Sequence, residues 1–252
     1  MATDAHPILA EQRDVWDRKP GLRAIYADYH RRMLAALRHP GAPQGPVLDV
    51  GAGSNRFKAL DRDVISLDIA AAPWVDVQGD ACRLPLADAS LAGIAMLDVL
   101  HHLVDPLPFF REAQRCLKPG GRLVLIEPGM TLLSYPFYRH LHREPADLSV
   151  DPFEPRRQDG PVDPFDSNQA IPTLLFQRQA HRMRLVSEVP GLRPVDRSWL
   201  SLFAYPLSGG FQRWSLLPGA LTGPLLALEQ RLLPFIGPIM AFRLLVVMER
   251  TG

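Results

Sequence analysis

The sequence lacks most features of secreted, membrane-spanning or nucleic-acid-binding proteins. Cys82 and Cys116 are the only cysteines among 252 residues, which excludes a disulfide scaffold and a four-cysteine zinc site and fits a cytoplasmic location. The formal net charge is +1, so no overall field attracts nucleic acid, and we expect no nucleic-acid partner. Charged residues are scattered through the first 19 positions, so no apolar signal core is visible there.

Long apolar runs are also missing. The uncharged stretch from Trp214 to Leu228 has 15 residues and is interrupted by Pro218 and Pro224. A transmembrane helix needs about 20 apolar residues, so we expect no membrane-spanning segment. The composition, 47% hydrophobic and 22% charged, is that of an ordinary globular protein.

Hydrophobic periodicity predicts a helix followed by alternating strands and helices. Apolar residues recur at helical spacing from Leu22 to Leu37, and Pro40 and Gly41 end this helix. Asp105 and Pro106 are typical of the start of a second helix, which we expect to run through Leu117. Strands are expected at 47–50, 64–69, 74–77, 94–97, 122–127 and 242–248. This alternation predicts an α/β fold with a mostly parallel sheet and helices on both faces.

Acidic residues follow four of these strands. Asp49 precedes the glycine-rich turn Gly51-Ala52-Gly53, and Asp68, Asp80 and Asp98 end the following strands. Because the carboxyl ends of parallel strands border one crevice, we expect these side chains to face a shared ligand. The dinucleotide fingerprint would require a third glycine where Arg56 stands, which disfavours a nicotinamide-dependent dehydrogenase.

The same segments resemble the class I S-adenosylmethionine-dependent methyltransferases, in particular the branch of quinone C-methyltransferases and small-molecule O-methyltransferases. The resemblance covers roughly residues 45–130, in the segments VLDVGAGS (47–54), ISLDI (65–69), GDACRLPLADAS (79–90), AMLDVLHHLVDP (95–106) and LKPGGRLVLIEPG (117–129). It implies a Rossmann-like, mostly parallel seven-stranded sheet with an N-terminal helical segment and an insert after the fifth strand. It also implies S-adenosyl-L-methionine as cofactor and S-adenosyl-L-homocysteine as product.

The resemblance assigns cofactor contacts residue by residue. Gly51 and Gly53 would accommodate the methionine part, and Asp68 would bind the ribose. Asp98 would lie near the methionine amino group. The candidates for the adenine and for the rest of the cofactor site are Asp80, Ala81, Asp49, Ser54 and Ile69.

Candidate catalytic residues lie near the fourth and fifth strands. A deprotonated acceptor requires a base, and histidine is the usual one near neutral pH. By resemblance, His101 faces the methyl-transfer site, although capping of the fourth strand explains His101 and His102 equally well. Glu127 ends the fifth strand, and His142 is a second candidate base.

We expect no metal site. The segment with His140, His142 and Glu144 has spacing that could suit a metal, but no cysteine or further histidine lies nearby.

The remaining segments predict three parts within the chain. Residues 1–44 would form an N-terminal helical cap, in which Trp16, Lys19, Arg23 and Tyr26 are candidates for a lid over the cofactor, unless the helix simply packs on the sheet. Residues 45–130 would bind the cofactor, and 131–252 would form the acceptor-binding insert and the last strands. The stretch from 199 to 242 is aromatic and poor in charge, so we expect it to contact an apolar ligand, a second subunit as in a homodimer, or a membrane surface peripherally.

Two function classes remain open on the sequence. The first is an enzyme that methylates oxygen or carbon of a small molecule with a sizeable aromatic or isoprenoid-like part. The second is a catalytically silent, methyltransferase-like scaffold. The complete set of strand-end acids favours the enzyme, because a scaffold needs neither Asp68 nor Asp80.

Overall fold

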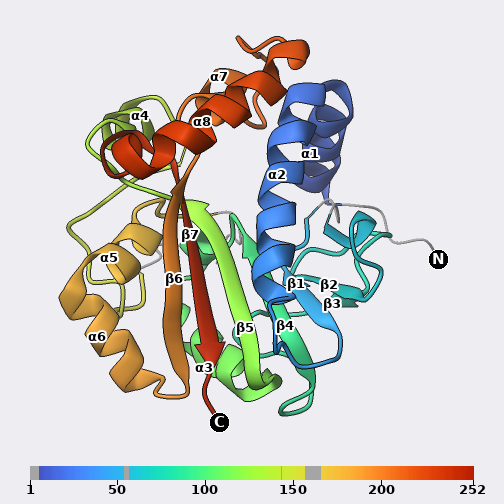
Figure 1. Ribbon diagram of the computed structural model, residues 1–252. Coiled ribbons are helices and arrows are strands. Elements are labelled where there is room, and N and C mark those ends of the chain that lie inside the picture. Colours follow the sequence, from blue (N-terminus) through green and yellow to red (C-terminus); the bar gives the residue numbers. More distant parts are fainter. Residues whose placement is uncertain (1–5, 54–56, 143, 157–165) are drawn as a thin grey trace.

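Seven strands form one sheet in the computed structural model, which describes residues 6–53, 57–142, 144–156 and 166–252 (Figure 1). The strands are β1 (Val47–Val50), β2 (Val64–Asp68), β3 (Val77–Gln78), β4 (Leu91–Leu97), β5 (Leu117–Pro128), β6 (Leu192–Leu200) and β7 (Arg243–Arg250). Their order is β3-β2-β1-β4-β5-β7-β6. β7 is antiparallel to both of its neighbours, β5 and β6, and the other described strand pairs are parallel. The predicted mostly parallel, seven-stranded architecture is therefore confirmed.

Helices cover both faces of the sheet. They are α1 (Pro7–Arg18), α2 (Pro20–Leu37), α3 (Pro106–Cys116), α4 (Ser134–His140), α5 (Ile171–Gln177), α6 (Gln179–Glu188), α7 (Ala204–Ser208) and α8 (Gly219–Met240). Because side chains alternate along a strand, neighbouring residues of β1 join different cores. Val47 packs in one apolar cluster with Ile25 of α2, and Leu48 packs in the other with Phe109 of α3.

Local signals in the sequence account for several element boundaries. The Asp105 carboxylate accepts a hydrogen bond from the Leu107 N–H at 2.9 Å, which confirms it as the cap of α3. Residues 118–121, between the helix and the strand expected from the sequence, lie inside β5, where the pairing with β4 shifts register. In the insert, Asp151 accepts from the Phe153 N–H, as expected for an Asp-Pro turn, whereas the similar residues 162–165 lie outside the described residues.

The predicted third strand, 74–77, starts three residues before the observed strand β3. Trp74 and Val75 form a loop, and only Val77 of the predicted segment belongs to β3. The reason is the Asp76 carboxylate, which accepts from the N–H and the hydroxyl of Ser66 on β2 and thereby takes the place of backbone pairing. Between Gly53 and Val64 the described crossover is a 3-10 turn, Phe57–Ala59, as short as the sequence spacing requires.

The charge-poor C-terminal segment contains the longest described helix. α8 has 22 residues and includes Pro224, Pro234 and Pro238. Several of its apolar side chains are exposed, with Phe235 the most at 79%. None of the described helices has both the length and the apolar character that crossing a bilayer requires. That this face of α8 meets another surface stays a prediction.

Candidate active site

The turn after β1 is built around a close backbone approach. Gly51 has φ +68°, and a Cβ atom there would lie 2.2 Å from Cγ2 of Val99. The N–H groups of Gly51 and Ala52 both donate to the carbonyl of Leu67 on β2, at 2.8 and 3.0 Å. Only glycine fits this position, and the turn therefore leaves bare backbone facing the space above the strand ends.

Two acids lie at this turn. The Asp68 carboxylate accepts from the Gly53 N–H and the Ala70 N–H, both at 2.8 Å, which fixes its orientation beside the loop. Asp49 is buried, and no described residue hydrogen-bonds its carboxylate. Burial, helped by the charge of Asp68, raises the pKa of Asp49 to about 7. An unpartnered buried acid is a preformed site for a positively charged ligand group.

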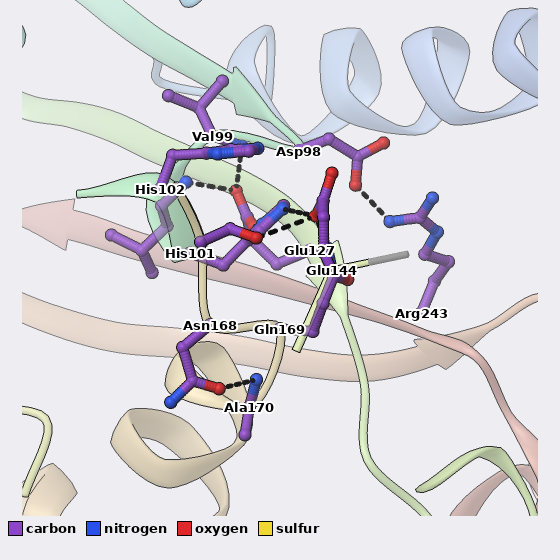
Figure 2. Close-up of polar contacts among 12 residues, drawn as sticks. Asp98, Val99, His101, His102, Glu127, Glu144, Asn168, Gln169, Ala170 and Arg243 are labelled. Atoms are coloured by element: carbon purple, nitrogen blue, oxygen red, sulfur yellow. Dashed lines mark hydrogen bonds and ion pairs between the residues drawn. The ribbon is translucent and has the colours of Figure 1, made fainter. Parts of the chain in front are cut away.

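Asp98 is held in an unusual conformation after β4. Its φ is +59°, and its carboxylate accepts from the Tyr26 hydroxyl at 2.9 Å and forms an ion pair with Arg243 (Figure 2). Arg243 is 2% exposed, and its guanidinium lies 4.0 Å from the Tyr205 ring centroid. Burial opposes the charge on Arg243, but Asp98 and the tyrosines outweigh it and hold its pKa well above the ordinary value. The contact joins segments 145 residues apart.

A cavity of about 710 Å³ opens above these residues. It is lined on one side by the turn after β1 and on the other by α4 and by the chain around α7. Small-molecule sites are commonly about 300–1,000 Å³ in volume, so this cavity is large enough for a substantial ligand. Its lining includes Asp49, Gly51, Gly53, Asp98, His101, His102, Tyr138, His142, Glu144, Tyr205 and Arg243.

His101 lies between two carboxylates (Figure 2). Its Nδ1 is 2.6 Å from Oε2 of Glu127, and its Nε2 is 3.4 Å from Oε2 of Glu144. The other oxygen of Glu127 accepts from the N–H groups of Val99 and Leu100, each at 2.8 Å. Burial acts to lower the pKa of His101, but the two carboxylates outweigh it and raise the pKa to about 9.

Two further histidines line the same wall. Burial and the charge of His101 lower the pKa of His102 to about 4, and its Nδ1 is buried without a hydrogen-bond partner among the described residues. Burial likewise lowers the pKa of His142, so its ring is neutral at pH 7. The Nδ1 of His142 accepts from the Glu144 N–H at 3.2 Å.

The N-terminal helices close one side of the cavity. Trp16 of α1 and Tyr26 of α2 are cavity residues whose rings meet edge to face, with centroids 5.6 Å apart. Lys19, between the two helices, is buried, and its Nζ lies 2.5–2.9 Å from four carbonyl oxygens, those of Ser208, Gly210, Gln212 and Trp214. That these residues form a lid over the cofactor stays a prediction.

This arrangement coincides with a family match. Residues 15–125 match the family described as a methyltransferase domain. This part of the chain is therefore similar to the class I S-adenosylmethionine-dependent methyltransferases.

Named relatives resemble the same part of the chain, and a solved structure shares its fold. Malonyl-[acyl-carrier protein] O-methyltransferase from Methylococcus capsulatus is 31% identical over 134 residues, which are 45% of this chain and 48% of that protein. Demethylmenaquinone methyltransferase from Paenarthrobacter aurescens is 32% identical over 112 residues, 39% of this chain and 44% of that protein. Each match thus spans less than half of the relative. A SAM-dependent methyltransferase from Archaeoglobus fulgidus has the same fold, with a TM-score of 0.52, 14% identity and coverage of 90% of this chain and 94% of that chain.

The cavity brings together many, but not all, of the residues singled out in the sequence. Glu127 lies behind His101 and does not line the cavity. Asp68 lies beside the glycine turn, also off the cavity wall. The other candidates off the wall are Ile69, which is 53% exposed, the exposed Asp80, and Ala81. Ser54 lies outside the described residues. The cofactor roles of these residues stay predictions.

A charged cavity residue was missed. Arg243 received no role from the sequence, although it is one of four charged residues between 199 and 248 and could have been found by that rarity. Among the aromatic residues expected at the acceptor, Phe137, Tyr138, Tyr205, Phe211 and Trp214 line the cavity. Phe153 and Phe176 are buried in the core instead.

Proposed function

We propose that this protein transfers the methyl group of S-adenosylmethionine to a hydroxyl oxygen or an activated carbon of a small molecule with a large apolar part. The observation that carries the proposal is the single cavity shared by the glycine turn with Asp49 and Asp98 and by the aromatic wall of α4 and α7. The acids suit the cationic cofactor, and the aromatic side chains suit an apolar acceptor.

The residues at the turn fit the cofactor. Gly51 leaves a cradle that a Cβ atom would fill, and Asp49 offers an unpartnered carboxylate. In this proposal the Asp98 carboxylate binds the methionine amino group of the cofactor. Tyr26 and Arg243 hold the Asp98 carboxylate in position. Asp68 binds the ribose hydroxyls, with Asp80, Ala81 and Ile69 on the adenine side. When bound, the cofactor supplies a methyl group on a positively charged sulfur.

The acceptors of two relatives support a small acceptor. One name specifies demethylmenaquinone, and the other malonyl-acyl-carrier protein. The cavity wall with Phe137, Tyr138 and Tyr205 favours the first kind, a ring with an apolar substituent. In this proposal residues 131–252 select the acceptor and residues 45–130 hold the cofactor. A silent scaffold is disfavoured because the cavity keeps its acids.

An oxygen or carbon acceptor must lose a proton, and we assign its removal to His142. Because the pKa of His101 is about 9, its ring carries a proton on both nitrogens at pH 7 and cannot accept another. This protonation disfavours His101 as the base. His142 lies on the cavity wall and is neutral. To accept the proton, its Nδ1 must give up the hydrogen bond from the Glu144 N–H, or the ring must exchange tautomers.

A methyl-transfer screen tests the proposal. The protein would be incubated with methyl-labelled S-adenosylmethionine and a panel of quinols, phenols, prenylated alcohols, sugars and amino acids, and products would be identified by mass spectrometry. We expect methylation of acceptors that carry an aromatic or isoprenoid group. Methylation of only small, highly polar acceptors would overturn the apolar-acceptor assignment.

The base assignment has its own test. His142→Ala should lower turnover by roughly 100-fold, the usual contribution of a general base, with the affinity for S-adenosylhomocysteine unchanged. His140→Ala removes an exposed histidine off the cavity wall and is the control. Equal turnover of the His142 variant and the control would exclude His142 as base.

A further inference from the structure

We propose that His101, His102 and Glu144 form a binding site for a divalent transition-metal cation of the zinc class on the acceptor side of the cavity. This inference rests on the proposed function only for the role of the ion, and not for its binding. Two imidazoles and one carboxylate are a ligand set of open, catalytic metal sites, in which further positions remain for water or substrate.

The three side chains converge. One ligand atom from each lies within 4.8 Å of the other two. His101 Nε2 and Glu144 Oε2 are 3.4 Å apart, which is about the separation of two ligand atoms that bind one tetrahedral ion at about 2.1 Å. Figure 2 shows His102 beside His101, and their ring centroids are 4.3 Å apart.

The second ring nitrogens are already engaged in the way that metal-bound histidines require. His101 Nδ1 contacts Glu127 at 2.6 Å, so the His101 ring is oriented with Nε2 toward Glu144. A carboxylate on the far nitrogen is the usual partner of a metal-bound imidazole. The backbone of Asp166 lies close enough to the His102 ring to act on its pKa. Glu144 is held in turn by the Ser167 hydroxyl at 3.0 Å and by a short hydrogen bond from Gln169.

His102 provides an independent observation. Its Nδ1 is buried and has no hydrogen-bond partner among the described residues, although buried ring nitrogens are normally paired. The residue lines the cavity together with His101 and Glu144. A cation bound by this nitrogen satisfies it without any change of backbone.

The ion would act on the acceptor. Its open positions would face the cavity beside Asp98, where the methyl donor is expected. An acceptor hydroxyl that binds there forms a metal–oxygen bond and releases its proton to His142 or to water, because a bound cation lowers the pKa of the oxygen. The oxygen then takes the methyl group from the sulfonium, which leaves as the neutral thioether. Binding of the cation itself displaces the proton from His101 Nε2.

Metal titrations test the site without reference to turnover. The full chain, purified and treated with chelator, would be titrated with Zn²⁺ by calorimetry and with Co²⁺ by visible absorption. We expect one tight site per chain with Co²⁺ bands of four- or five-coordination, and at least 10-fold weaker binding in His102→Ala and in Glu144→Gln. His140→Ala, which removes an exposed histidine close in sequence, should bind like the wild type. Near-ultraviolet circular dichroism confirms that each variant is folded.

The outcomes separate this inference from the proposed function. Wild-type binding no tighter than that of the two ligand variants overturns the metal site, whatever the methyl-transfer screen finds. Ten-fold weaker binding in either folded variant supports it, even if no acceptor is methylated. Glu127→Gln should weaken Zn²⁺ binding by about 10-fold through the orientation of His101, and an unchanged affinity in that variant would contradict its positioning role.

Discussion

At the turn after β1, the side chain of Val99 leaves space beside Gly51 for a hydrogen atom only. We expect Gly51→Ala to lower the free energy of unfolding by about 2–4 kcal/mol, because the methyl group meets Val99 at 2.2 Å and the residue must keep a positive φ. Urea unfolding measures this. Gly223→Ala is the control, since no atom lies within 4 Å of its Cβ position in α8. Equal midpoints for Gly51→Ala and wild type would contradict the close approach.

Asp49 should make stability depend on pH. Its pKa is about 7 in the folded chain and about 4 in an unfolded one, so its ionisation opposes folding. The stability that the protonated Asp49 carboxyl contributes is fully present below about pH 4 and is lost as the pH rises to 7. The total change in unfolding free energy is a few kcal/mol.

Asp49→Asn therefore should remove this part of the pH dependence. We expect the difference in unfolding free energy between variant and wild type to shift in favour of the variant from pH 4 to pH 8, measured by urea unfolding at several pH values. A constant difference across this range would show that Asp49 titrates normally.

The ribose assignment of Asp68 predicts a loss of cofactor affinity. Asp68→Ala should weaken S-adenosylhomocysteine binding by about 10- to 100-fold, the loss of about 1.5–3 kcal/mol that a hydrogen bond to a charged group contributes. Calorimetric titration measures it. Asp63→Ala, whose side chain is 79% exposed, is the control. Unchanged affinity in Asp68→Ala would exclude the ribose contact.

At the scale of elements, Lys19 connects the junction of α1 and α2 to the chain after α7. Lys19→Met keeps the length of the side chain but leaves four carbonyl oxygens without the ammonium group. We expect a loss of about 2–4 kcal/mol in unfolding free energy and faster hydrogen exchange at 208–216.

A lysine on the surface gives the matched control. Lys58 pairs with Asp76, and both side chains are 36% exposed, so Lys58→Met should cost less than about 1 kcal/mol. If the two lysine variants have equal stability, the four carbonyl contacts contribute no more than a surface ion pair.

The elements that the sequence predicted well are those with local signals. β1 is predictable because Val47 to Val50 are all buried between helices, and α3 because Asp105 caps it. α8 was not predicted, since Pro224, Pro234 and Pro238 are typical of helix ends and its largely apolar sequence hides the helical period. β6 was also missed, because five of its nine residues, 193–197, are exposed on the edge of the sheet, and three of these five are charged.

At the scale of the whole molecule, the site depends on contacts that no local pattern reveals. The glycine turn and its acids could be found because they are consecutive in the sequence. Two contacts could not be found from the sequence, the pairing of Asp98 with Arg243 and that of His101 with Glu144. Each contact joins segments that only the folded sheet and insert bring together. The direction of the pKa of His101 follows from those contacts, so the sequence alone favoured it as a base.

The position of β7 has a consequence for the order of events on the ribosome. β7 is the last strand along the chain, yet it lies between β5 and β6 in the sheet and begins with Arg243. In a nascent chain that has reached residue 240, the five strands from β1 to β5 can pair in their sheet order. β6 then lacks its neighbour β7, and Asp98 lacks its ion-pair partner Arg243. The Asp98–Arg243 ion pair can thus form only after β7 has emerged, so we expect a nascent chain that stops at residue 240 to lack this contact at the proposed cofactor site.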